Sequence, residues 1–136
     1  MDRDQQLAER MADIDARIRL LEAVIAGPEG REIDFDALLA QASGIAGDLM
    51  TAYAHHAGKP MPETRDLLET LRAFVKGDPS LNAVRDNVRE LVYYRNCLEM
   101  GKTDALPVRP AHMAVRTARH LYLYLYTRCS QEHRLP

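Results

Sequence analysis

Apolar residues recur along much of the chain at steps of three and four, the spacing of one face of an α-helix. The clearest run falls within residues 3–26 and consists of Leu7, Met11, Ile14, Ile18, Leu21 and Ile25. Alternating steps of four and three form an a/d seam, but three heptads are short for a free coiled coil. We therefore expect this helix to pack on a bundle or on a partner, and the sequence GPEG at 27–30 to end it.

A second helix is predicted over residues 35–57, with Asp34 as its N-cap. Its apolar face consists of Leu38, Leu39, Ala42, Ile45, Ala46, Leu49, Met50 and Tyr53. Gly44 and Gly47 lie one turn apart within it, and each glycine costs about 1 kcal/mol of helix propensity relative to alanine. The pair indicates either close approach of another helix or simple tolerance.

Three segments that contain Gly and Pro divide the rest of the chain into three more helices: GKPMP at 58–62, GDP at 77–79 and GKTDALPVRP at 101–110. Thr64 is expected to cap a helix that ends near Val75, with Leu67, Leu68, Leu71 and Phe74 facing inward. Asp78 or Ser80 is expected to cap a fourth helix that begins at Pro79 and runs to Met100, with Gly101 after its end.

The fifth helix is expected from Pro110 to Gln131. Within it, HLYLYLYT at 120–127 alternates as a strand would, but no second strand candidate exists to pair with it. We expect a helix buried nearly all round, with Tyr122 and Tyr126 stacked one turn apart. The predicted fold class is all-α: a compact antiparallel bundle of about five helices in one domain, 1–136.

Composition excludes several classes of protein. The 46% apolar content favours a folded chain, and no apolar run approaches the roughly 20 residues of a membrane span. The acidic, polar N-terminus does not resemble an export signal, so we expect a cytoplasmic protein with Cys97 and Cys129 as free thiols. No phosphate-binding loop, dinucleotide motif or metal-ligand spacing is present, so we expect no cofactor and no metal.

Charge is distributed unevenly. Residues 1–70 hold 7 Lys and Arg against 14 Asp and Glu, a balance of −7, whereas residues 71–136 hold 11 against 6, a balance of +5. No acid occurs from Ala105 to Gln131. The asymmetry indicates either an anion-facing surface or two halves that complement each other.

One arginine interrupts the apolar row of the fourth predicted helix. That row steps by three and four through Leu81, Val84, Val88, Leu91, Arg95 and Leu98. An unpaired buried charge is very costly, so Arg95 must pair, reach water or line a cavity. A pair with Glu99 one turn on, or extension past Leu91 to solvent, would satisfy it.

The order of these motifs resembles the HEPN superfamily, small all-α domains found in toxin–antitoxin and antiviral systems. The resemblance covers residues 35–130 and rests on AGKPMP, then TRDLLETL, then RNCLEMG, then ALP before a long final helix. It implies a four-helix core over residues 35–131, with residues 1–26 as an added N-terminal helix. It also implies RNA cleavage without a metal, by an arginine and a histidine that meet at a homodimer interface. A nucleotidyltransferase-like antitoxin is an implied protein partner.

The family signature is Arg-Asn-x-x-x-His, and this chain has Met100 where the histidine is expected. A thioether cannot move a proton, so we expect no catalytic residue. The residues expected to contact a ligand or an interface are Arg95, Asn96, Glu99, Met100 and Tyr94.

Other histidines offer weak substitutes for the missing one. Arg128 and His133 fit Arg-x4-His literally, but they fall in a tail expected to fray. A displaced base would otherwise have to come from His55, His56, His112 or His120.

Three functions remain open at this point. The first is a non-catalytic HEPN-like domain that homodimerises through its fourth and fifth helices and binds a protein partner or a nucleotide- or RNA-type ligand. The second is a metal-independent ribonuclease that uses a displaced base. The third is an unrelated helical adaptor or assembly factor that docks through its first helix.

Overall fold

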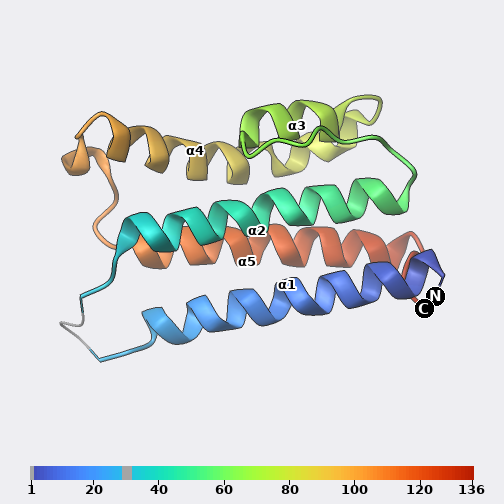
Figure 1. The fold of residues 1–136 in the computed structure, drawn as a ribbon, viewed down its shortest axis with the longest axis horizontal. Helices are drawn as coiled ribbons and strands as arrows, with labels where there is room; N and C mark the ends of the chain where they lie inside the picture. The colour runs from blue at the N-terminus through green and yellow to red at the C-terminus, as the bar shows by residue number, and fades with distance from the viewer. Residues whose placement is uncertain (1, 29–31) are drawn as a thin grey trace.

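The computed structural model describes residues 2–28 and 32–136, and it is all-helical over those residues (Figure 1). The elements in chain order are α1 (Arg3–Ile25), α2 (Phe35–His56), α3 (Leu67–Val75), η1 (Pro79–Val84), α4 (Arg85–Glu99), η2 (Thr103–Ala105) and α5 (Pro110–Gln131). The predicted all-α bundle is confirmed. The predicted breaker at residues 27–30 lies partly outside the described residues.

The centre of the bundle is the contact between α2 and α5. These two helices run in the same direction, while α1 and α4 run the opposite way (Figure 1). One flank is closed by α1, which packs on both central helices, and the other flank is closed by α4, which also packs on both. The short α3 lies over α2 and α4, so α2 is bordered by α1 on one side and by α3 and α4 on the other.

The apolar seam of α1 packs inside this bundle. Leu7, Met11, Ile14, Ile18 and Leu21 are all buried. Because these side chains face α2 and α5, the seam is occupied by the chain's own helices rather than left open for a partner.

Helix caps agree with the sequence at the start of α2 and at the end of α4. Asp34 accepts a hydrogen bond from the Ala37 amide at 3.1 Å, and Gly101 follows α4 with a φ of +65°, as expected of a C′ glycine. The cap of α3 is Asp66 instead of Thr64, since its Oδ1 accepts from two amides of the first turn. The Thr64 hydroxyl accepts a hydrogen bond from the Asp66 amide and so helps to position the capping residue.

The fourth predicted helix begins differently from expectation. Asp78 accepts from the Ser80 amide, but the turn it caps is the 3-10 segment η1, and the α-helix starts only at Arg85.

The Leu/Tyr stretch at 120–127 is helical, and the Tyr122 and Tyr126 rings stack with centroids 5.6 Å apart, as predicted. The expectation of burial all round is wrong. Leu121 and Leu125 are buried, but Leu123 is 49% exposed and Tyr126 is 41% exposed. The helix therefore has one face in the core and one in solvent.

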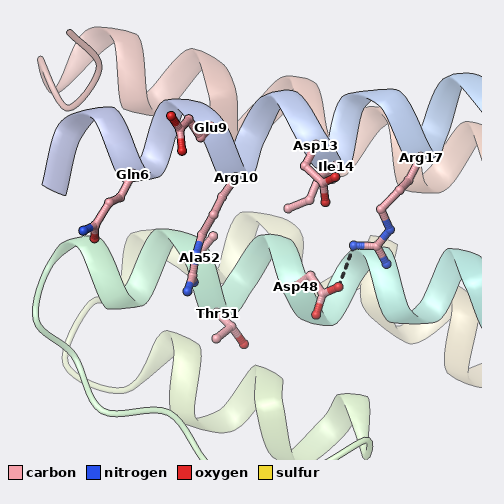
Figure 2. Close-up of a pocket in the computed structure, with 9 residues that line it drawn as sticks. All are labelled: Gln6, Glu9, Arg10, Asp13, Ile14, Arg17, Asp48, Thr51 and Ala52. Carbon is pink, nitrogen blue, oxygen red and sulfur yellow. Dashed lines mark hydrogen bonds and ion pairs between the residues drawn. The ribbon is translucent and has the colours of Figure 1, made fainter. Parts of the chain in front are cut away.

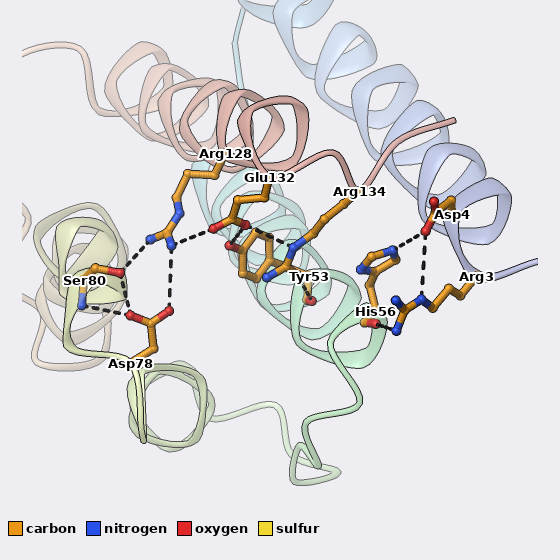
Figure 3. A network of polar contacts seen from close by, with 9 residues as sticks. All are labelled: Arg3, Asp4, Tyr53, His56, Asp78, Ser80, Arg128, Glu132 and Arg134. Atoms are coloured by element: carbon orange, nitrogen blue, oxygen red, sulfur yellow. Dashed lines mark hydrogen bonds and ion pairs between the residues drawn. The ribbon is translucent and has the colours of Figure 1, made fainter.

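The C-terminal tail is held, contrary to the expected fraying (Figure 3). Arg134 donates to the Tyr53 carbonyl at 3.1 Å and lies 3.0 Å from the Glu132 carboxylate. Glu132 also accepts from the Tyr53 hydroxyl at 2.5 Å and from Arg128 at 3.0 Å. These contacts fasten the end of α5 to α2.

Within the described residues, no helix combines the length and the apolar character needed to cross a membrane.

Candidate functional site

Arg95 lies at the edge of the core and not within it. The buried positions of α4 are Val88, Leu91, Tyr94 and Cys97, so the inward row continues in steps of three after Leu91 and passes Arg95 by. The Arg95 side chain is 30% exposed. The predicted core-facing position is therefore wrong by one residue.

The partner of Arg95 is Asp36, in the first turn of α2. Its NH1 group donates to Asp36 Oδ1 at 2.9 Å, and its NH2 group donates to the Asp36 carbonyl at 3.4 Å. This pair joins the ends of α2 and α4, and it replaces the expected pair with Glu99. The two residues are 59 positions apart, so helical spacing gave no indication of the contact.

A groove of about 790 Å³ lies between α2 and the side formed by α3 and α4. From α4, three of the five candidate residues line it together: Arg95, Asn96 and Glu99. On the α2 side of the groove, most of the lining residues are small: Ala40, Ser43, Gly44, Gly47 and Thr51.

The two glycines of α2 do not mark a close helix contact within the described chain. A Cβ at Gly44 would lie 3.8 Å from Arg17, and a Cβ at Gly47 would lie 3.6 Å from a Leu67 methyl. Both are ordinary van der Waals distances to side chains. Of the two interpretations of the glycine pair, simple tolerance of glycine within the helix therefore fits, and close approach of another helix does not.

A second groove, of about 710 Å³, lies on the other side of α2 against α1 (Figure 2). Arg17 reaches across it to Asp48 at 2.7 Å, and Arg10 extends from the same helix toward α2. Asp48 and Thr51 line both grooves, so the outward side of α2 forms the divide between them.

The other two candidates lie apart from the groove. Tyr94 is buried and donates its hydroxyl hydrogen bond to Glu90, whose second oxygen accepts from Thr117 of α5 at 2.9 Å. Burial, and then this bond to a carboxylate, raise the pKa of Tyr94 well above its usual range. Tyr94 is thus a structural link between α4 and α5. Met100 caps the end of α4 and is 61% exposed.

The described histidines make no hydrogen bond with Arg95. His55 and His56 end α2, about 28 Å along the helix axis from Asp36. The His56 ring contacts Asp4 of α1 at 2.7 Å, and the His112 ring contacts Arg109 at 3.0 Å. Over residues 2–28 and 32–136, no histidine lines either groove.

The two cysteines and the acidic groups show no further reactive site. Cys97 and Cys129 are free and buried, and burial raises the pKa of the Cys129 thiol to about 11. A thiol with a raised pKa is a poor nucleophile. The described residues contain no cluster of His, Cys, Asp and Glu that could hold a metal ion.

Charge asymmetry is partly explained by contacts between the two halves. Arg119 of α5 lies 2.5 Å from Asp15 and 2.6 Å from Glu22, both on α1, and Arg95 meets Asp36. Pairing between the acidic first half of the chain and the basic second half therefore explains the positions of Arg119 and Arg95. Arg116 is exposed and has no polar partner among the described residues, so it is not explained in this way.

Comparison with family models, with curated proteins and with solved structures found no match to this chain.

Proposed function

We propose that this chain is a non-catalytic, HEPN-like helical domain that homodimerises and binds a protein partner. The carrying observation is the environment of Arg95. Its guanidinium is already held by the Asp36 carboxylate and carbonyl, and no histidine of the described residues lines its groove. General acid–base cleavage of RNA requires a titrating group within hydrogen-bond reach of the reacting oxygen.

The side chain at the expected histidine position supports the same conclusion. Met100 is exposed and does not line the groove that contains Arg95 and Asn96. A methionine there cannot donate or accept the proton, and the pairing with Asp36 reduces the positive charge that Arg95 could offer to a phosphate.

Exposed apolar side chains support the dimer. Tyr93 and Met100 project from one face of α4, and the Tyr93 hydroxyl donates to the Ala105 carbonyl in the connection that leads to the fully exposed Val108. We call Tyr93, Met100 and Val108 the α4 patch. Large apolar side chains that are exposed seven residues apart on one helix face, as Tyr93 and Met100 are, are typical of an interface.

An RNA assay without metal tests the absence of catalysis. Structured and single-stranded RNA are incubated in chelator with the wild-type chain, with Arg95→Ala and with Met100→His, which restores the family signature. We expect the wild type and Arg95→Ala to leave RNA intact alike. Cleavage by the wild type that Arg95→Ala abolishes would instead establish the ribonuclease.

A further inference from the structure

The outward face of α5 carries a line of exposed side chains at steps of seven, four, three and four. It consists of Arg109 at the N-cap, then Arg116, His120, Leu123 and Thr127. We call this set the α5 stripe. It spans 19 residues, and the 18 steps between the first and the last correspond to about 27 Å of helix.

No carboxylate of α5 itself balances the cations of the stripe, because the chain has no acid from Ala105 to Gln131. Arg116 and His120 make no hydrogen bond or ion pair with any described residue, and the Arg109 guanidinium meets only His112, at 3.0 Å. The stripe therefore offers the guanidinium groups of Arg109 and Arg116 and the ring of His120 as donors that no described carboxylate binds.

Carboxylates that reach α5 from neighbouring helices are already occupied. Glu90 of α4 accepts from Tyr94 and from Thr117, and Glu22 of α1 is bound by Arg119. The charge of Glu22 is therefore offset by Arg119, whereas Glu90 is held by two neutral hydroxyl groups and forms no ion pair with the stripe.

An apolar surface continues the stripe toward the C-terminal end of α5. Leu123 is 49% exposed and Tyr126, on the adjoining side of the helix, is 41% exposed. A straight helix face with cations at one end and apolar groups at the other matches a second helix that has acidic and apolar positions on one side.

We infer that the α5 stripe docks an acidic amphipathic helix of a partner protein. A second copy of this chain would bring the same cations and no carboxylate to an α5–α5 contact, so like charges would oppose it. Phosphate groups would meet the arginines but would leave Leu123 and Tyr126 without apolar contact. The inference rests on the proposed binding function, but not on the dimer, because the stripe shares no residue with the α4 patch.

Fluorescence anisotropy with designed peptides tests this inference. The probe is a labelled peptide of about 21 residues, three heptads with Leu at a and d and Glu at e and g. Its counterpart has Lys in place of Glu. We expect the full chain to bind the acidic peptide at least about tenfold more tightly than the basic one, with affinity falling as salt rises from about 50 to about 300 mM.

Matched variants locate the contact. Arg116→Glu should weaken acidic-peptide binding about tenfold, and Leu123→Ser should weaken it severalfold without any change of charge. Arg72→Glu is the control, since Arg72 is an exposed arginine on α3 with no polar partner among the described residues. Circular dichroism confirms that each variant is folded.

Three results would overturn the inference. They are equal binding of both peptides, equal weakening by Arg116→Glu and Arg72→Glu, and no saturable binding up to about 200 µM peptide. Binding of single-stranded RNA that Arg116→Glu removes, without binding of the acidic peptide, would assign the stripe to nucleic acid. The molecular mass of each variant is recorded in parallel, so failure of the dimer is seen separately from failure of the stripe.

Discussion

Replacing Gly47 with alanine should stabilise the protein. Gly47 lies in the interior of α2, where alanine has a helix propensity about 1 kcal/mol more favourable than glycine. The new Cβ would lie 3.6 Å from the Leu67 methyl, an ordinary contact that needs no movement of either helix. The free energy of unfolding should therefore rise by about 1 kcal/mol, and Tm by about 4 °C.

Urea unfolding followed by circular dichroism measures this change, with Gly101→Ala as the matched control. Gly101 has a φ of +65°, so alanine there should lower the free energy of unfolding by about 1–2 kcal/mol. The two substitutions are chemically identical and should have opposite signs. Destabilisation by Gly47→Ala would refute the reasoning, since it would mean that another surface meets the α2 backbone more closely than Leu67 does.

Three further predictions concern other elements. Arg119→Met should lower the free energy of unfolding by about 1–3 kcal/mol in urea melts, because the largely buried guanidinium joins two carboxylates of α1 to α5. Burial raises the pKa of Glu132, but the bonds from Tyr53 and Arg128 and the nearby Arg134 outweigh it and hold that pKa below its usual range. Its stabilising contribution should thus be present above about pH 4.3 and be lost as pH falls through the lowered value, and Glu132→Gln should flatten that part of the stability–pH curve. Met100→Glu should shift the chain toward monomer in light scattering, whereas Leu20→Glu, at an exposed leucine on α1, should leave its mass unchanged.

Local signals were sufficient to predict the helices. Apolar spacing located α1, α2 and α5 to within a residue or two. Asp34 marked the start of α2, and Gly101 marked the end of α4, through cap chemistry that depends on near neighbours alone. The 3-10 start of the fourth helix was missed because the apolar steps at Leu81 and Val84 are the same for a 3-10 turn and for an α-turn.

The surroundings of Arg95 could not be predicted in the same way. Spacing along α4 cannot distinguish a row that passes through Arg95 from one that passes through Tyr94, because both are three or four residues from Leu91. Its partner, Asp36, lies on another helix, and only the packing of α2 against α4 brings the two together. The groove likewise had no sign in the sequence, although two of the small α2 residues that line it, Gly44 and Gly47, stood out there.

The solution mass of the wild-type chain tests the central claim, a dimerising domain, most directly. Light scattering during gel filtration at tens of micromolar should give twice the chain mass of 15.4 kDa. A mass of 15.4 kDa across that concentration range would contradict the account, because the α4 patch would then remain open to solvent in the native protein.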